Sequence, residues 1–359
     1  MTITPSTLKG LKGKRVLVTG STGFKGSWLC TWLTEMGAEV SGFALPPKPD
    51  APLFDQLKLR HRIDQHDGDI RDYNLINEVI KKTKPEVIIH LAAQALVRQS
   101  YQNPKETFDT NVGGGINLLE AVRNCPDVRA LVFITSDKCY KNKEWIWGYR
   151  ENDELGGPDP YSASKAATEN VFEGYYQSFL KTNRAIGAVT ARAGNVIGGG
   201  DLSEDRIIPD CIRALRTKTP IKVRNPIATR PWQHVLEPLS GYLTLTARIL
   251  KNPNKISGSW NFGPNTEDVR PVKEVAELAS KIWGFGSVNV QKDQSANRES
   301  NLLMLSSDKA KTQLAWNPLW NFERCVTETI DWYKKFDEGQ NPLDLSLSQI
   351  ASYISSSVR

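Results

Sequence analysis

A short run of β-branched residues that leads directly into a glycine-rich turn is the feature that most restricts the fold of this chain. Arg15–Thr19 (RVLVT) has the pattern of a buried strand, and Gly20-Ser-Thr-Gly23-Phe-Lys-Gly26 follows it and opens a helical stretch at Ser27–Met36. The first glycine permits a tight turn, the second lets backbone N–H groups approach a pyrophosphate, and the third lets the helix pack closely on the sheet. This order predicts a dinucleotide site at the N-terminus of a helix.

Strand and helix patterns continue to alternate through the first half of the chain. Further strands are expected at Glu39–Leu45, Val87–Ala92, Ala130–Ser136 and Ala185–Ala191, and helices at Ile70–Lys84, Thr107–Asn124 and Tyr161–Leu180. Alternation at this spacing predicts an α/β fold, a Rossmann-like doubly wound parallel sheet with right-handed crossovers.

From about Gly194 the alternation loosens, and proline and glycine become frequent. Helical patterns remain at Arg206–Thr217, Glu237–Leu250, Pro271–Trp283 and Asn321–Phe336. We expect residues 1–193 to form a dinucleotide-binding domain that also carries the catalytic residues. Residues 194–359 are expected to form mainly a smaller, mixed α/β substrate domain, with an approximate boundary across which segments can interleave.

The composition excludes several other classes of protein. The chain has 359 residues, of which 39% are hydrophobic and 24% charged, enough to fill a sizeable core. No stretch reaches the roughly 18 apolar residues of a membrane span, and the first residues lack the apolar core of a secretory signal, so a cytoplasmic protein is expected. The five cysteines are scattered and never form CxxC, which predicts neither a disulfide framework nor a zinc site. The net charge of +6 comes without a dense basic run and does not indicate a nucleic-acid partner.

The second expected strand ends without the acidic residue that would bind the adenosine ribose of a dinucleotide. It runs Ser41-Gly-Phe-Ala-Leu-Pro-Pro-Lys48, with neither an acid nor an arginine. This position therefore does not distinguish NAD from NADP, and it indicates a loosely held cofactor. Asp69, just before the next helical stretch, is placed to meet the adenine end.

Tyr161-Ser-Ala-Ser-Lys165 places a phenol and an ammonium group one turn apart on one helical face. A neighbouring Lys⁺ is expected to lower the pKa of the phenol, which suits a tyrosine that removes a proton from a sugar hydroxyl. The lysine can also bind the nicotinamide ribose. The spacing alone is equally that of an exposed pair, but together with the glycine turn and Ser136 at a strand end it favours a catalytic group.

With these elements the chain resembles the extended short-chain dehydrogenase/reductases over most of its length. The resemblance is carried by GSTGFKG, DGDI, HLAAQ, TNV, ITSDKCY, YSASK and ARAGNVIGGGD. It implies NAD as the cofactor, held by Gly20, Thr22, Gly23, Phe24, Lys25, Gly26, Asp69, Ile70, Leu91, Ala92, Ala93, Gln94, Thr110, Tyr161 and Lys165.

Within this family the chain looks like the nucleotide-sugar 4,6-dehydratases rather than the 4-epimerases, because Ser136 is followed by Asp137 and Lys138. Asp137 matches the acid position of the dehydratases, whereas Lys138 stands where the dTDP-glucose enzymes usually have Glu. That departure and the GFKG turn resemble the CDP-glucose 4,6-dehydratases.

A lysine base must be neutral, so its pKa would have to be lowered by burial or by nearby positive charge. The resemblance implies that the catalytic residues are Ser136, Asp137, Lys138, Tyr161 and Lys165. The simpler alternative for Asp137 and Lys138 is a surface ion pair.

The expected substrate residues are Ser136, Asn195, Arg206, Arg230 and Arg298, at positions where the family contacts phosphate, pyrophosphate and ribose. A guanidinium is permanently charged and binds phosphate oxygens in bidentate fashion, although a single arginine is more often a solvated surface residue. No residue is identified that reads the cytosine base, so CDP-glucose as substrate follows from the overall resemblance. His234 is assigned no chemistry.

The resemblance further implies deoxysugar biosynthesis, including that of lipopolysaccharide O-antigen, and a homodimer through the helices at Thr107–Asn124 and Tyr161–Leu180. No nucleic-acid, membrane or metal partner is expected. Three alternatives remain open: another nucleotide-sugar 4,6-dehydratase, a 4-epimerase that does not need Asp137 and Lys138, and a non-catalytic dinucleotide-binding regulatory protein. Proteins of the last kind often lose the Tyr or Lys of YxxxK, and this chain retains both.

Overall fold

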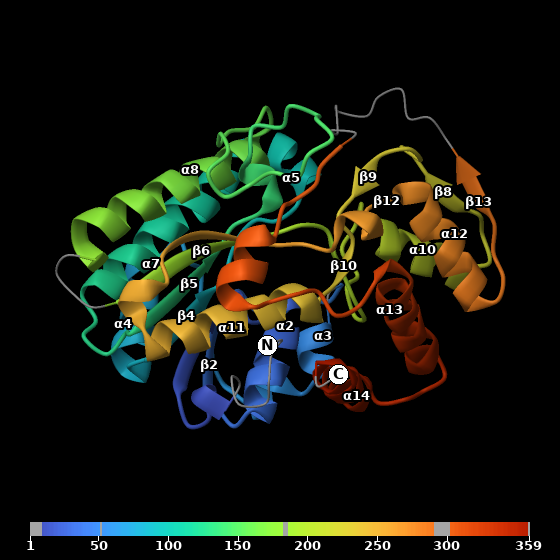
Figure 1. Ribbon diagram of the computed structural model, residues 1–359. Coiled ribbons are helices and arrows are strands. Elements are labelled where there is room, and N and C mark those ends of the chain that lie inside the picture. Colours follow the sequence, from blue (N-terminus) through green and yellow to red (C-terminus); the bar gives the residue numbers. More distant parts are fainter. Residues whose placement is uncertain (1–8, 51, 182–185, 291–301, 358–359) are drawn as a thin grey trace.

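A seven-stranded parallel sheet forms the centre of the protein, as the computed structural model of residues 9–50, 52–181, 186–290 and 302–357 shows (Figure 1). The strand order is β11-β6-β5-β4-β1-β2-β3, and every neighbouring pair is parallel. The strands are β1 (Arg15–Thr19), β2 (Glu39–Ala44), β3 (Asp64–Asp67), β4 (Val87–His90), β5 (Ala130–Ile134), β6 (Gly187–Ala193) and β11 (Gly258–Phe262). The expected doubly wound α/β sheet is therefore confirmed.

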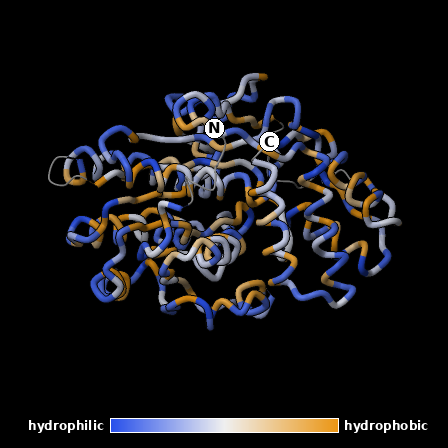
Figure 2. Tube along the Cα trace, turned by 60° about the horizontal axis from the view of Figure 1, so that its bottom comes forward, coloured by the Kyte–Doolittle hydropathy of each residue, from blue (hydrophilic) through white to orange (hydrophobic). Residues whose placement is uncertain are grey.

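Helices cover both faces of this sheet. Successive apolar side chains of a strand point to opposite faces, so each face needs helices to bury them. α4 (Tyr73–Thr83), α7 (Gly114–Arg123) and α8 (Pro160–Tyr175) lie on one face, and α2 (Phe24–Glu35) and α11 (Leu236–Lys251) on the other (Figure 1). Leu17 and Leu131 point into the first core, whereas Val18 and Val132 point into the second. Figure 2 shows apolar stretches of the chain alternating with polar connections, as this arrangement requires.

The C-terminal half adds a smaller mixed group of helices and short strand pairs. α10 (Ile207–Arg216) and α12 (Val272–Trp283) lie beside the pair β8 (Ile221–Val223) and β13 (Val288–Val290), and α13 (Phe322–Asp337) packs against α12 (Figure 1). Two further pairs join β7 (Val196–Ile197) to β10 (Gln233–His234) and β9 (Thr229–Arg230) to β12 (Arg270–Pro271). Their apolar residues are continuous with the core between the sheet and α11.

The remaining elements complete the described chain. They are α3 (Leu53–Gln56), α5 (Val97–Gln102), α6 (Pro104–Phe108), α14 (Pro342–Ser356), the 3-10 turns η1 (Lys9–Leu11), η2 (Leu59–His61), η4 (Asp137–Cys139), η6 (Pro253–Lys255) and η7 (Thr266–Asp268), and the π turns η3 (Asp109–Gly113), η5 (Tyr176–Leu180) and η8 (Ala310–Leu314).

Several elements differ from the expectations. β3 and α14 were not expected, and neither was β11, which lies beyond residue 193 and pairs with β6 in the main sheet. The helix expected over Thr107–Asn124 is divided into the end of α6, the π turn η3 and α7. The C-terminal segments thus interleave with the N-terminal sheet.

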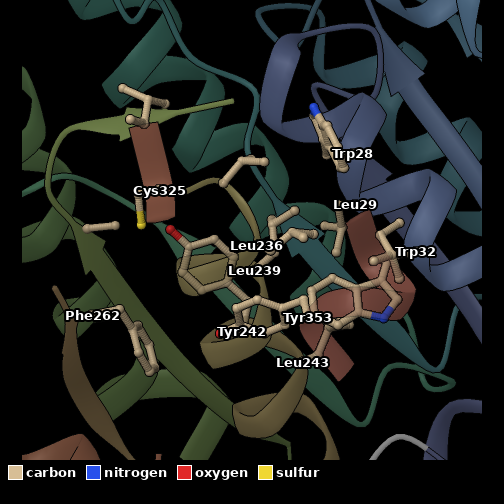
Figure 3. Close-up of a cluster of buried hydrophobic side chains, with 14 of the residues drawn as sticks. Trp28, Leu29, Trp32, Leu236, Leu239, Tyr242, Leu243, Phe262, Cys325 and Tyr353 are labelled. Carbon is tan, nitrogen blue, oxygen red and sulfur yellow. The ribbon is translucent and has the colours of Figure 1, made fainter. Parts of the chain in front are cut away.

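Large aromatic side chains fill the contact between α2, α11 and α14. Trp28 and Trp32 of α2 lie in the same cluster as Leu239 and Leu243 of α11 and Tyr353 of α14 (Figure 3). The rings of Trp32 and Tyr353 meet edge to face with centroids 5.8 Å apart. This packing fixes the C-terminal helix against the helix that follows the glycine turn.

Two expectations about excluded features can be compared with the described residues. Within the described ranges, no helix is both long and apolar enough to cross a membrane. All five cysteines are buried and none forms a disulfide.

Glu237 is a fully buried carboxyl group that ties α11 to the C-terminal segments. It accepts hydrogen bonds from the backbone N–H groups of Leu319 and Trp320, at 3.0 and 2.7 Å, and from the Tyr353 hydroxyl at 2.6 Å. Burial raises the pKa of Glu237 from 4.5 to about 7, although these three donors favour the charged form.

The raised pKa of Glu237 predicts how stability changes with pH. The folded state binds this proton more tightly than the unfolded state, so the contribution is complete below about pH 4.5 and is lost as pH rises to about 7. Glu237→Gln keeps an oxygen acceptor but removes the titration. Between pH 5 and 8, the unfolding free energy of Glu237→Gln should therefore rise relative to that of the wild type, by on the order of 3 kcal/mol at most. The difference is measured as a melting temperature that increases relative to the wild type over this pH range. Parallel melting curves across this range would contradict the assignment.

Candidate active site

The turn between β1 and α2 requires glycine at its two ends. Gly20 has φ +74°, and a Cβ atom there would lie 2.8 Å from the backbone nitrogen of Ala92. A Cβ atom on Gly26 would lie 2.0 Å from the carbonyl oxygen of Gly20, so the helix can approach the turn only without a side chain. Gly23 differs: it is exposed, and a Cβ atom there would meet only the Gly20 oxygen, at 3.3 Å.

The N-terminus of α2 therefore provides a suitable cradle for a dinucleotide pyrophosphate. No side chain caps this helix, so its first N–H groups keep their donor capacity. Thr22 donates from its hydroxyl to the carbonyl of Leu45 at 2.9 Å, which joins the turn to the end of β2. Burial lowers the pKa of Lys25 to about 8; Arg206 lowers it further, while Asp137 opposes this change. Phe24 begins α2 and is partly buried.

Asp69, which was expected to meet the adenine end of the cofactor, is held by Arg71. The guanidinium Nε lies 2.9 and 3.1 Å from the two carboxylate oxygens, and this hydrogen bonding lowers the pKa of Asp69. Ile70 is buried against α7, where a Cβ atom on Gly114 would lie 2.6 Å from its side chain. Leu45 directly follows β2 and is exposed, at the position where an acidic residue would bind the adenosine ribose of a dinucleotide.

The loop after β4 contains Leu91, Ala92, Ala93 and Gln94, all of them partly exposed, and Asn111 of η3 fixes its end. The Asn111 side chain accepts from the backbone N–H of Gln94 at 2.8 Å and donates to its carbonyl at 3.1 Å. It also donates to Ser164 of α8 at 2.8 Å. Asn111 was not among the expected site residues, although it follows the expected Thr110 within the TNV motif, and it connects the cofactor loop to the YxxxK helix.

Ser136 and Asp137 follow β5 and form a hydrogen-bonded unit. Ser136 donates from its hydroxyl to Asp137 Oδ1 at 3.0 Å and accepts from the backbone N–H of Lys138 at 3.2 Å. Asp137 is 3% exposed, and its Oδ2 is buried without a hydrogen-bond partner among the described residues. Burial raises the pKa of Asp137, although Lys138 and the Ser136 hydrogen bond act against this. A buried carboxyl group with a raised pKa suits a general acid, and it excludes a surface ion pair with the partly exposed Lys138.

Tyr161 and Lys165 are both buried, at 7% and 5% exposure, so they are not an exposed helical pair. The expected lowering of the phenol pKa is wrong for this structure. Burial raises the pKa of Tyr161 to about 12, and the groups that oppose this are the Ser136 hydroxyl and Arg206 rather than Lys165. Burial also lowers the pKa of Lys165 to about 8, an effect that Lys25 strengthens.

Tyr242 of α11 is a further buried hydroxyl group in this part of the protein, and no sequence pattern indicates it. Its hydroxyl is fully buried and has no hydrogen-bond partner in the part of the chain that the structure describes. Burial raises its pKa, and the charges of Asp137 and Tyr161 add to this effect.

Three of the expected substrate residues, Asn195, Arg206 and Arg230, lie on the segments that follow β6. Asn195 is partly exposed between β6 and β7, and Arg206 donates to Asp201 at 2.9 Å just before α10. Arg230 of β9 is 6% exposed, and its charge acts on Asp137. Arg298 lies outside the described residues. His234 is buried against the rings of Trp28 and Trp320 with its pKa lowered by burial to about 3, in keeping with a role in packing.

Comparison with known proteins gives a family match over most of the chain. The sequence profile of the family described as GDP-mannose 4,6-dehydratase matches residues 17–329. A CDP-glucose 4,6-dehydratase of Salmonella typhimurium is 44% identical over 352 residues, covering 97% of this chain and 98% of that protein. A UDP-glucose 4-epimerase of Halalkalibacterium halodurans is 27% identical over 90% of this chain and 97% of its own.

Solved structures with the same fold are more distant in sequence. An epimerase of Methanothermobacter thermautotrophicus superposes with a TM-score of 0.80 at 22% identity, covering 93% of this chain and 96% of that one. A dTDP-glucose 4,6-dehydratase of Bacillus anthracis, solved in complex with NAD, gives a TM-score of 0.75 at 22% identity over 91% of this chain and 99% of its own. At this identity the likeness supports the fold.

Gly23→Ala should separate cofactor binding from folding. The backbone at Gly23 (φ −75°) accepts any residue, and a Cβ atom would meet only the Gly20 oxygen, at 3.3 Å, so a small shift of the turn suffices and the variant should fold with a melting temperature close to that of the wild type. The added methyl group would stand where phosphates approach the turn, so we expect NAD⁺ affinity to fall by about tenfold or more in calorimetric titration.

Gly174→Ala is the matched control. Gly174 lies exposed in α8 with nothing within 4 Å of an added Cβ atom, so NAD⁺ affinity should not change. Equal NAD⁺ affinity in Gly23→Ala and the wild type would rule out a pyrophosphate at this turn.

Proposed function

The chain belongs to the GDP-mannose 4,6-dehydratase family, and on this premise we propose that it is an NAD-dependent CDP-D-glucose 4,6-dehydratase. It converts CDP-glucose to CDP-4-keto-6-deoxyglucose with loss of one water molecule. The reaction oxidises carbon 4, eliminates water across carbons 5 and 6, and reduces carbon 6, so that no cofactor is consumed.

One observation carries the proposal beyond family membership. The 44% identity to a CDP-glucose 4,6-dehydratase extends over 97% of this chain, and Asp137 and Lys138 follow Ser136 directly at the end of β5. A 4-epimerase only oxidises and re-reduces carbon 4 and has no need of a second acid and base. A buried Asp137 with a raised pKa, beside a partly exposed amine, supports elimination of water.

Tyr161 begins the reaction by taking the proton of the carbon 4 hydroxyl. When bound, NAD⁺ supplies the acceptor for the carbon 4 hydride and the donor that returns this hydride to carbon 6. The Ser136 hydroxyl, which acts on Tyr161, holds the carbon 4 oxygen, and Lys165 binds the nicotinamide ribose as an ammonium group. Because burial holds the pKa of Tyr161 near 12, bound positive charge must lower it for proton transfer.

Asp137 and Lys138 carry out the elimination. The ketone at carbon 4 acidifies the carbon 5 proton, which Lys138 removes, while Asp137 protonates the carbon 6 hydroxyl that leaves as water. After hydride arrives at carbon 6, Lys138 returns a proton to carbon 5. Tyr161 ends with one proton more and Asp137 with one fewer, and exchange with solvent restores both.

The nucleotide is held by the second half of the chain. Residues 1–193 bind NAD and supply the catalytic groups, and residues 194–359 bind mainly the nucleotide sugar. Asn195, Arg206, Arg230 and Arg298 contact the phosphate and ribose groups of CDP-glucose. Since Arg206 is paired with Asp201 at 2.9 Å, it binds phosphate from a fixed position.

The protein acts as a cytoplasmic homodimer in deoxysugar biosynthesis of the kind that supplies O-antigen. Exposed Phe108 of α6 and Ile116 of α7 support a dimer contact at this helical face. No nucleic acid or membrane takes part in the reaction.

Mass spectrometry of CDP-glucose incubated with NAD⁺ and the protein in deuterated water tests this function. We expect loss of one water and uptake of one deuterium at carbon 5. An unchanged mass with a new 4-epimer would identify an epimerase, and water loss only from another nucleotide-glucose would replace CDP-glucose as substrate. No reaction with any donor would favour a binding protein.

Lys138→Ala should stop dehydration but leave oxidation at carbon 4. The variant lacks the base for the carbon 5 proton while Tyr161 and Ser136 remain, so absorbance at 340 nm should still rise on adding CDP-glucose. We expect water loss to fall about 100-fold or more. A variant that eliminates water at the wild-type rate would remove Lys138 from the mechanism.

A further inference from the structure

Glu169 lies on the same face of α8 as Tyr161 and Lys165. The three residues follow each other at intervals of four, so their side chains form one stripe along the helix. Glu169 is 4% exposed and pairs with Arg192 of β6, which is 2% exposed. No step of the mechanism uses this pair.

Both carboxylate oxygens of Glu169 are fully engaged. Arg192 donates from Nε to Oε1 and from Nη2 to Oε2, each at 2.8 Å. Thr135, directly after β5, donates its hydroxyl to Oε1, and Thr190 of β6 donates to Oε2 at 2.8 Å. Ser259 of β11 donates to Oε2 at 3.2 Å. One carboxylate thus holds α8 against three strands, and its hydrogen bonds with Arg192 keep its pKa low despite burial.

Arg192 extends this contact to the far side of the catalytic turn. Its Nη1 donates to the Tyr140 hydroxyl at 2.7 Å and to the Glu151 carbonyl at 3.0 Å. The guanidinium carbon also lies 4.8 Å from the centre of the Tyr140 ring. Tyr140 in turn donates from its hydroxyl to Asn261 at 2.8 Å.

Thr135 and Tyr140 are the residues on either side of Ser136–Cys139. Both flanks of the segment that carries Ser136 and Asp137 are therefore bonded to one buried ion pair, and the acid of that pair stands on the helix that carries Tyr161. The pair thus bridges α8 and the segment that follows β5.

We propose that Glu169 and Arg192 are positioning residues of the dehydration, fixing Ser136 and Asp137 relative to Tyr161 and placing a carboxylate one helical turn from the Lys165 amine. The proposal rests on the proposed function. A buried ion pair contributes little net stability, because desolvation offsets the attraction of the charges. Precise placement of acid and base groups, by contrast, is worth a large factor in rate.

The charge on Lys165 depends on what surrounds it. Lys25 from the start of α2 disfavours the ammonium form, and burial acts in the same direction. Glu169 favours it, as does Cys139 of η4 when ionised, although burial raises the pKa of that thiol far above neutrality. His90, at the end of β4, is neutral because burial lowers its pKa to about 3. Glu169 is therefore the anionic group that acts on Lys165 near neutral pH.

Glu169→Gln tests both parts of the proposal. We expect kcat to fall about 100-fold with little change in KM, since the bound groups are misplaced rather than lost. The alkaline limb of the pH profile, which reports deprotonation of Lys165, should move to lower pH by about one unit because an attractive charge is removed. Glu169→Asp keeps the charge and should restore the limb towards its wild-type position.

Glu237→Gln is the control for loss of a buried carboxylate. Its partners are Tyr353, Leu319 and Trp320, away from α8, so kcat and the alkaline limb should stay as in the wild type. A folded Glu169→Gln protein with the wild-type kcat and pH profile would overturn the proposal.

Tyr140→Phe keeps the test decisive if Glu169→Gln does not fold. It removes one hydroxyl and keeps the ring on Arg192, so it should fold and show a kcat about tenfold lower. A wild-type kcat in this variant would likewise refute the positioning role. If the wild type removes water from no nucleotide-glucose, the proposed function fails separately. The effect of Glu169→Gln on Lys165 is then read from the pH dependence of NAD⁺ binding, where an unchanged profile would overturn the proposal.

Discussion

All seven strands of the central sheet run in the same direction, so their carboxyl ends meet at one edge, and the groups of the site follow those ends. Gly20 follows β1, Gln94 lies beyond β4, Ser136 follows β5 and Asn195 follows β6. Tyr161 joins them because α8, the crossover between β5 and β6, begins at the same edge. Residues more than a hundred positions apart are therefore brought together by strand direction, before any specific side-chain contact forms.

The parts of the fold that could be predicted are those whose residues are buried on both sides. β1, β4 and β5 are short continuous apolar runs, and such runs are required where helices cover both faces of a sheet. β3 reads Asp-Gln-His-Asp and lies at the sheet edge, so its strand conformation comes from pairing with β2 rather than from apolar residues. β11 contains only Trp260 and Phe262 as large buried groups and lies in a region rich in glycine and proline. Both segments are strands because they pair with β2 and β6, and their own residue patterns do not indicate this.

In the candidate site, the residue types and their spacing along the chain could be predicted from the sequence. The burial of these residues and their partners from distant segments could not. The spacing of Gly20, Gly23 and Gly26 follows from the geometry of one turn, and the structure shows the close contacts that demand glycine at Gly20 and Gly26, whereas Gly23 has none of this severity. The pKa of Tyr161 depends on how deeply α8 is buried, which outweighs the neighbouring lysine that the sequence displays. Glu169 could not have been singled out, because its partners come from β6, β11 and the end of β5 and only the folded chain unites them.

The position of β11 in the chain has a consequence for how the protein is made. This strand closes the edge of the sheet beside β6, yet it is synthesised only after β7 to β10 and the helices α10 and α11. At ribosomal rates of about 5–20 residues per second, the growing chain presents an uncapped β6 edge for at least several seconds. Exposed strand edges pair readily with other chains, so this interval is when a nascent chain is open to misassociation and to chaperone binding. Ser259 reaches Glu169 and Arg192 only when that interval ends, so the catalytic sheet matures late in translation although most of it is encoded early.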